Sequence, residues 1–327
     1  MINDFRHQKN NNYYAIDIEP NSNNSWISKP TPVVKWAGGK RQLLNELRSK
    51  YPDKLKKGLI KTYLEPFCGG GAVFFDIYSS YKIEKAYLFD KNIELIILYK
   101  VIQYDVYKLI DKLYELGEKY LNLSLDERSE FYYKTRKLYN TFDKKINSNT
   151  YSPKWIERAS YTIFLNKTCF NGLYRVNRKE EFNVPIGAYK NPKILCENNL
   201  IAANKAFKIA EIKHDDFSKV LEYANESTFI YYDPPYRPIS RKNNFRSYTS
   251  LRFDDNEQQR LQQVFVKASQ LKALQMLSNS DPKNYTDDTF FDELYKEFNI
   301  SRFLALRMIN SKSSKRGNIK EIIITNY

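Results

Sequence analysis

The chain has few of the residues that disulfide frameworks, metal sites and acid–base triads require. Its three cysteines, Cys68, Cys169 and Cys196, are scattered and odd in number, which fits neither a disulfide framework nor a zinc-ligand spacing. Its two histidines, His7 and His214, leave little for a histidine-centred triad or a metal cluster. We therefore expect no bound metal and a reduced, cytoplasmic protein of the bacterial intracellular type.

Long apolar segments are also missing, and acidic residues are outnumbered. No apolar run approaches the roughly 18 residues of a membrane span, and the N-terminus lacks the apolar core of a signal peptide, so we expect no membrane partner. The chain has 53 Lys and Arg and only 38 Asp and Glu, which gives a net charge of +15. This surplus favours a polyanionic partner, most often nucleic acid, over the alternative of a merely soluble basic protein.

Glycine is scarce, and its distribution is uneven. The chain has 10 glycines in 327 residues, less than half of the roughly 7% that is usual in proteins. Five of them form two clusters, Gly38-Gly39 and Gly69-Gly70-Gly71, which therefore need an explanation. The hydrophobic fraction of 42% and the aromatic fraction of 15% suffice for a buried core and exclude wholesale disorder.

Secondary-structure signals alternate after a polar lead-in. Residues 1–29 are rich in Asn, Ser and charge, which is typical of a flexible arm. Residues 62–65 and 85–90 then read as short buried strands, and a helix is expected from Ile93 toward Leu116. The order strand, glycine turn, helix, strand and acid is the opening of a nucleotide-binding α/β sheet, a Rossmann-like fold.

The middle of the chain interrupts this alternation. Residues 100–204 are helical, aromatic and basic, so we interpret them as an inserted, mainly helical domain. Residues 30–99 and 205–327 then form one α/β domain, with a helix expected between Asp255 and Lys272. Further strands are expected at residues 210–214, 228–232, 274–278, 301–308 and 321–325.

The first strand ends in a glycine-rich turn. Glycines at 69–71 let the backbone approach a ligand closely, and the helix that follows offers free N–H groups. Asp90, at the end of the next strand, is placed to accept hydrogen bonds from ribose hydroxyls. Phe74 breaks the dinucleotide pattern, and no Gly-Lys-Ser/Thr ends the turn. A nucleoside site is therefore favoured over a dinucleotide or triphosphate site, the alternative being a purely structural helix start.

A second turn, Asp233-Pro234-Pro235-Tyr236, follows the strand at 228–232. Two prolines stiffen this turn, so it presents a carboxylate, a rigid carbonyl and an aromatic face together. Asp233 and the Pro234 carbonyl would accept both N–H bonds of an exocyclic amine, while Tyr236 stacks on the base. The amine lone pair would then point at an electrophile without a metal or a covalent nucleophile. The alternative is a structural turn with a capping Asp.

Taken in order, these motifs resemble those of the Dam-type adenine-N6 DNA methyltransferases (D12 class, alpha group), which include enzymes that methylate GATC. The resemblance runs from about Thr31 to Tyr327 and implies a Rossmann-like S-adenosylmethionine-dependent methyltransferase sheet with a DNA target-recognition domain at 100–204. The motifs are the segments 35–40, 65–71, 89–90, 171–175, 182–185, 233–236 and 245–248.

The resemblance also implies a role for each matching residue. Base flipping would bring the adenine to the site at a cost of a few kcal/mol, with Phe170 inserted into the duplex and Lys35 and Arg175 donating to guanine. The implied catalytic residues are Asp233, Pro234, Pro235 and Tyr236. The implied cofactor-binding residues are Trp36, Lys40, Glu65, Pro66, Phe67, Gly69, Gly71, Asp90 and Asp233. The implied DNA-binding residues are Lys35, Phe170, Asn171, Leu173, Arg175 and Pro185.

Two features of the sequence differ from those of relatives, and the sequence leaves two alternative functions. Ala188 replaces an Arg found in some relatives, and residues 1–29 extend beyond most of them, so GATC is the expected rather than the established target. The expected partners are double-stranded DNA and a restriction endonuclease that cuts the same site. A methyltransferase acting on RNA adenine or a protein amide is one alternative, although the amide-modifying relatives favour Asn where this chain has Asp233. The other is a non-catalytic DNA-binding relative, against which the intact 233–236 turn argues.

Overall fold

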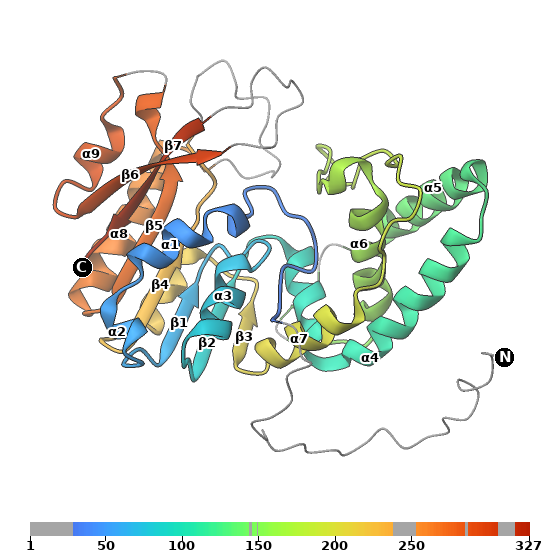
Figure 1. Cartoon of the computed structure of the whole chain (residues 1–327), viewed down its shortest axis with the longest axis horizontal. Coiled ribbons are helices and arrows are strands. Elements are labelled where there is room, and N and C mark those ends of the chain that lie inside the picture. The colour runs from blue at the N-terminus through green and yellow to red at the C-terminus, as the bar shows by residue number, and fades with distance from the viewer. Residues whose placement is uncertain (1–28, 144–145, 149, 238–252, 285–286, 307–317) are drawn as a thin grey trace.

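A seven-stranded sheet organises the part of the chain that the structure describes (Figure 1). The computed structural model describes residues 29–143, 146–148, 150–237, 253–284, 287–306 and 318–327. The strand order is β3-β2-β1-β4-β5-β7-β6. The strands are β1 (Thr62–Glu65), β2 (Lys85–Phe89), β3 (Ala210–Lys213), β4 (Thr228–Tyr232), β5 (Leu274–Ser280), β6 (Asn299–Leu306) and β7 (Asn318–Thr325).

The first five strands run parallel, and β7 pairs antiparallel with both β5 and β6. Each lies where the sequence predicted a strand, and the expected Rossmann-like α/β fold is confirmed. The chain moves outward from β1 to β3 and then returns to place β4 beside β1 on its other side. The order therefore reverses between β1 and β4, and ligands of such sheets bind at the carboxyl ends of the strands at this point.

Alternating side chains of β4 explain why both faces of the sheet are covered. Phe229 and Tyr231 are buried in one hydrophobic cluster, and Ile230 and Tyr232 in the other. A central parallel strand buried on both faces is expected to be apolar throughout. The helices of the first cluster include α1 (Leu44–Lys50), α2 (Asp53–Lys56), α3 (Ala72–Ser80) and α7 (Glu197–Phe207). Those of the second are α8 (Asp255–Gln270) and α9 (Phe290–Leu294).

Three helices project to one side of the sheet (Figure 1). They are α4 (Ile93–Leu121), α5 (Leu125–Thr141) and α6 (Trp155–Thr168). Ser124 and Glu127 form a capping box at the start of α5, and α4 has a non-helical residue, Asp105, within it. A buried fork–fork ion pair between Glu94 and Arg158 fastens α4 to α6.

A search of the described residues finds no helix that is both long and apolar enough to cross a membrane.

Candidate functional site

The glycine turn lies between β1 and α3, at the point where the strand order reverses. Gly71 has φ +71° and forms the left-handed residue before α3, and Gly69 has φ +48°. These conformations strain any residue with a Cβ. The amide of Cys68 donates to the Phe89 carbonyl at 2.9 Å, and the Tyr99 hydroxyl donates to the Gly69 carbonyl. The turn is therefore fixed to the ends of β2 and α4.

Asp90 faces this turn from the end of β2. Its two carboxylate oxygens accept from the amides of Gly69 and Asn92, each at 2.8 Å. Burial raises the pKa of Asp90, although those amides favour the charged form and partly offset the rise. The acid that the sequence placed after the second strand thus holds the glycine turn directly and keeps lone pairs for a ligand hydroxyl.

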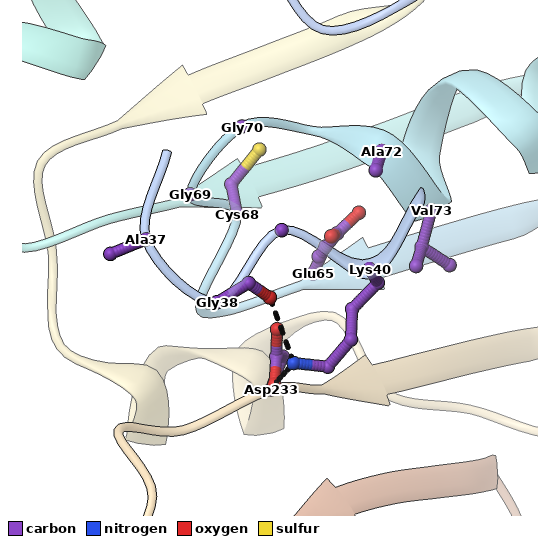
Figure 2. A pocket seen from close by; sticks show the side chains of 11 residues that line it. Ala37, Gly38, Lys40, Glu65, Cys68, Gly69, Gly70, Ala72, Val73 and Asp233 are labelled. Atoms are coloured by element: carbon purple, nitrogen blue, oxygen red, sulfur yellow. Dashed lines mark hydrogen bonds and ion pairs between the residues drawn. The ribbon is translucent and has the colours of Figure 1, made fainter. Parts of the chain in front are cut away.

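The turn after β4 brings Asp233 against Lys40. The Lys40 Nζ lies 2.6 Å from Asp233 Oδ1 and also donates to the Gly38 carbonyl at 3.0 Å (Figure 2). The side chain of Lys40 is only 5% exposed and that of Asp233 is 18% exposed. Ser278 on β5 donates to the same carboxylate oxygen at 3.2 Å. Burial raises the pKa of Asp233, while Lys40 and Ser278 lower it in part.

The ring of Tyr236 lies beneath the same ammonium group. Lys40 Nζ is 4.6 Å from the ring centroid, within the range of a cation–π interaction. The Tyr236 hydroxyl donates to Glu321 Oε2 on β7 at 2.8 Å. Burial and the nearby carboxylates of Asp233 and Glu321 raise the pKa of this hydroxyl, which keeps it protonated. At this turn, Lys40 Nζ therefore lies as a nitrogen donor between the carboxylate of Asp233 and the aromatic ring of Tyr236.

The two prolines of the turn have different surroundings. The Pro235 carbonyl accepts from Gln258 Nε2 on α8 at 3.3 Å. The Pro234 carbonyl, by contrast, accepts no hydrogen bond from any described residue. Pro234 itself is buried, and a buried carbonyl without a partner is uncommon in folded proteins. The turn thus leaves an acceptor beside Asp233 for a ligand.

Arg237 anchors the end of the turn to α8 and to the start of α9. Its guanidinium forms a fork with Asp255, with Nε–Oδ1 at 2.6 Å and NH2–Oδ2 at 2.9 Å. It also pairs with Asp288 and lies over the ring of Phe290, 4.2 Å from the centroid. The position of Tyr236 is therefore supported from α8, from β7 and from the start of α9. The segment 245–248, which also belongs to the motifs of the family resemblance, lies outside the described residues.

A small cavity joins the two turns (Figure 2). Four of the residues predicted to bind a cofactor line it: Lys40, Glu65, Gly69 and Asp233. Glu65 accepts from the Tyr63 hydroxyl at 2.8 Å, and burial raises its pKa, with the charges of Asp233 and Asp90 adding to the rise. Glu65 and Asp233 thus line the cavity with two carboxylates, and Asp90 lies beside the glycine turn, an arrangement that favours a ligand that is cationic or rich in hydroxyl groups.

The other predicted cofactor residues lie around this cavity rather than in its lining. Trp36 packs on the glycine turn, since a Cβ at Gly69 would lie 3.2 Å from its ring, and it stacks on Tyr174 at 4.8 Å between centroids. Phe67 turns away and packs against Phe217, with ring centroids 5.4 Å apart. Pro66 and Gly71 are buried parts of the turn itself.

The residues predicted to read DNA lie on a hairpin and on the segment beside it. We call residues 170–187 the recognition hairpin. Isolated bridges pair Cys169 with Ile186 and Val176 with Phe182, and the Phe170 amide donates to the Pro185 carbonyl at 2.9 Å. The ring of Phe170 is 51% exposed. An exposed aromatic on a rigid turn is what insertion between base pairs requires.

Arg175 and Lys35 present the charged groups of this surface. The Nε of Arg175 donates to Asn183 Oδ1 at 2.7 Å across the recognition hairpin, which orients the exposed guanidinium. Lys35 is exposed, and its stem lies against Gly172, where an added Cβ would be 2.5 Å from Lys35 Cδ. Leu173 is half-buried and Asn171 is exposed, with φ +57° at Asn171. The predicted DNA-binding residues therefore lie on the recognition hairpin and, for Lys35, on the segment that contacts it at Gly172.

Four residues of this region were missed by sequence reasoning. Ser278 and Glu321 reach the 233–236 turn from β5 and β7, and Tyr99 and Asn166 hold the glycine turn and the recognition hairpin. Ser278 and Glu321 stand in strands that carry other polar residues as well, so no local sequence signal marked them. Within the described ranges, no group of three or more His, Cys, Asp and Glu side chains is placed to hold a metal ion.

Comparisons with known proteins agree with this geometry. A family model described as D12 class N6 adenine-specific DNA methyltransferase matches residues 36–309. The type II methyltransferase M.MjaIII of Methanocaldococcus jannaschii is 46% identical over 297 residues, which cover 90% of this chain and 99% of the relative. The type II methyltransferase M1.LlaDCHI of Lactococcus lactis subsp. cremoris is 37% identical, covering 90% and 95%. The DNA adenine methylase of Haemophilus influenzae is 33% identical, covering 90% and 93%.

Proposed function

Because the chain belongs to the D12 class of N6 adenine-specific DNA methyltransferases, we propose how this adenine-specific DNA methyltransferase acts: it takes the methyl group from S-adenosylmethionine and transfers it to an adenine flipped out of GATC. Asp233 and the Pro234 carbonyl accept the two N–H groups of N6, and Tyr236 stacks on the adenine ring. Pro235 keeps the turn rigid. These contacts hold the N6 lone pair toward the donor, and the proton that N6 must lose on methylation would pass along its hydrogen bond to Asp233 and on to water.

The observation that carries the proposal is the environment of Lys40 Nζ. This nitrogen donates to Asp233 at 2.6 Å and lies 4.6 Å from the centre of the Tyr236 ring. A stacked adenine would present its N6 to the same carboxylate and its ring to the same aromatic face. Lys40 and the adenine amine therefore compete for one position, and Lys40 withdraws when the base enters.

The residues around the glycine turn fit S-adenosylmethionine. When bound, the cofactor supplies an electrophilic methyl group on a positively charged sulfur. The buried carboxylates of Glu65, Asp90 and Asp233, whose pKa values burial raises, favour a cation and accept from ribose hydroxyls. Gly69 and Gly71 leave room at the start of α3, where side chains would meet Trp36 and Phe75. Lys40, Trp36, Pro66 and Phe67 complete the predicted cofactor set.

Duplex DNA would bind along the recognition hairpin and Lys35. A net charge of +15 supplies the salt-sensitive attraction to phosphates. Phe170 would fill the gap that the flipped adenine leaves, and Lys35, Asn171, Leu173, Arg175 and Pro185 would contact the bases. The domain division at 30–99, 100–204 and 205–327 is part of this proposal, with the break at Asp105 in α4 close to its first boundary.

Tritiated methyl transfer to matched substrates tests the proposal. The substrates are a duplex with one GATC, the same duplex with one base pair of that site changed, and single-stranded RNA of the same sequence. We expect label in the GATC duplex alone. Equal labelling of both duplexes would remove GATC as the target, whereas labelling of RNA alone would remove duplex DNA as the substrate.

A restriction endonuclease that cuts the same site is the proposed partner in the cell. Two of the relatives are named type II methyltransferases, and a methyltransferase of this kind would protect host DNA from that nuclease. Plasmid from cells producing the protein should resist a methylation-sensitive nuclease specific for GATC. Cleavage as complete as that of plasmid from cells producing Asp233→Ala would contradict modification of that site.

A further inference from the structure

Asn166, near the end of α6, joins two separate segments, the one around Lys35 and the recognition hairpin. Its Oδ1 accepts from the Lys35 amide at 2.8 Å, and its Nδ2 donates to the carbonyls of Lys35 and Gly172, each at 3.0 Å. Its side chain is buried, with the residue only 3% exposed. Both donors and one acceptor lone pair of the amide are therefore used to hold backbone.

Asn199 on α7 makes the same double contact elsewhere. Its Oδ1 accepts from the Thr31 amide at 2.8 Å, and its Nδ2 donates to the Thr31 carbonyl at 3.0 Å. In both places an amide side chain pairs with one residue of the segment before α1, as a neighbouring strand would. Asn199 is half-buried and also accepts from the Thr31 hydroxyl at 3.0 Å, whereas Asn166 is buried and has an additional bond to Gly172 in the recognition hairpin.

This additional bond sets the position of Lys35 relative to the recognition hairpin. Gly172 has φ +64°, and a Cβ there would lie 2.5 Å from Lys35 Cδ, so the lysine stem passes directly over this residue. Lys35 and Asn166 are 131 positions apart in the chain. Without the amide, two hydrogen bonds to Lys35 and one to Gly172 are lost together, and only the Lys35 stem on Gly172 and the stacking of Trp36 on Tyr174 still hold the two segments against each other.

We propose that Asn166 is a specificity-determining positioning residue, which holds Lys35 in register with the recognition hairpin so that both segments contact adjacent base pairs of one target. The inference rests on the proposed function. Lys35 and Arg175 would each donate to base edges, and such contacts require correct placement to discriminate between bases. A misplaced Lys35 weakens binding to the cognate site and leaves other sites almost unaffected, because those sites do not form the contact.

The experiment compares Asn166→Ala with the matched control Asn199→Ala. The readout is the ratio of kcat/KM on the preferred duplex to kcat/KM on a duplex with one changed base pair. We expect Asn166→Ala to lower this ratio by about 5- to 100-fold, the range that one base contact provides, and Asn199→Ala to change it less than about 2-fold. Asn166→Ala removes the hydrogen bonds of a buried amide and Asn199→Ala those of a half-buried one, so both should lower Tm.

A Lys35→Ala background separates positioning from stability. If Asn166 acts through Lys35, adding Asn166→Ala to Lys35→Ala should lower the ratio less than it does in the wild type. Equal ratios in Asn166→Ala and Asn199→Ala, or fully additive effects with Lys35→Ala, would overturn the inference.

Two further outcomes are distinguishable. Should Asn166→Ala fail to fold, Asn166→Asp keeps the volume and the acceptor for the Lys35 amide but removes both donor bonds, and the same fall in the ratio is expected. An unchanged ratio in Asn166→Asp would also count against the inference. Loss of sequence preference in the wild type itself would contradict the proposed function instead.

Discussion

Lys40 Nζ lies 2.6 Å from Asp233 Oδ1, although the two residues are far apart in the chain. This ion pair joins the 35–40 segment to the turn after β4 and places a cation on the face of Tyr236. Both side chains are withdrawn from solvent, so the pair is screened less than a surface salt bridge. The charge of Lys40 therefore influences the pH at which Asp233 is ionised and can act as a charged acceptor.

Lys40→Met should move the acid limb of the pH–activity profile to higher pH. Burial raises the pKa of Asp233 and Lys40 opposes that rise, so removing the ammonium leaves the carboxyl easier to protonate. Transfer requires the carboxylate, and kcat/KM therefore falls as pH drops through this pKa. A profile of kcat/KM against pH for both proteins checks the shift. Lys40→Arg, which keeps the charge, is the control and should leave the limb nearly in place.

The same raised pKa has the opposite consequence for stability. A carboxyl whose pKa is higher in the folded state stabilises the fold fully below its unfolded-state pKa, and this contribution is lost as pH rises through the folded-state pKa. Activity and stability thus respond to Asp233 ionisation in opposite directions.

Asp233→Asn should lower kcat by at least about 10²-fold, because the substitution removes the charged acceptor for N6. It also leaves the ammonium of Lys40 without its carboxylate partner, so the variant should lose stability. Adding Lys40→Met should restore part of that loss but no activity, with a coupling free energy of about 0.5–3 kcal/mol. Denaturant unfolding and methyl transfer of the single and double variants test this. Purely additive free energies of unfolding would show that the pair contributes no coupling.

Tyr236→Ala should weaken capture of the flipped base more than Tyr236→Phe. The alanine variant removes the stacking face, worth about 1–3 kcal/mol per base, whereas the phenylalanine variant removes only the hydroxyl that donates to Glu321 at 2.8 Å. Fluorescence of a duplex carrying 2-aminopurine at the target position reports the unstacked base. Identical signals from the two variants would argue that the ring itself does not hold the base.

Arg175→Ala should relax discrimination at one base pair by about 1–3 kcal/mol. Asn183→Ala should act in the same direction and less strongly, because Asn183 only orients the guanidinium through the 2.7 Å bond to its Nε. The measurement is kcat/KM on duplexes that differ at single positions. Equal weakening on every duplex would identify Arg175 as a phosphate contact, and the salt dependence of binding would then show a shallower slope.

Much of the sheet was predictable because its strands are short, apolar and bounded by turn residues. The strand 62–65 is followed by the glycine turn and the strand 228–232 by Pro234 and Pro235, and both were located correctly. Parallel strands place their carboxyl ends at one edge of a sheet, so Glu65, Asp90 and Asp233 were expected at one edge. In the structure, Glu65 and Asp233 line one cavity.

The contacts that complete the site were not predictable in the same way. The Lys40–Asp233 pair, the Tyr236–Glu321 bond and the three bonds of Asn166 link positions far apart in the chain. Neither residue of such a pair lies in a local sequence pattern that points to its partner, because the contact depends on how the strands are ordered in the sheet. Glu321 in particular reaches Tyr236 because β7 pairs antiparallel with β5, in register with Ser280.

The last described strand, β7, lies inside the sheet rather than at its edge. It pairs with β5 on one side and β6 on the other, and it delivers Glu321 to Tyr236. During translation, β6 therefore leaves the ribosome before the strand to which it pairs has been made. The pairing of β6 and the bond from Tyr236 to Glu321 therefore both form only after β7 has been made.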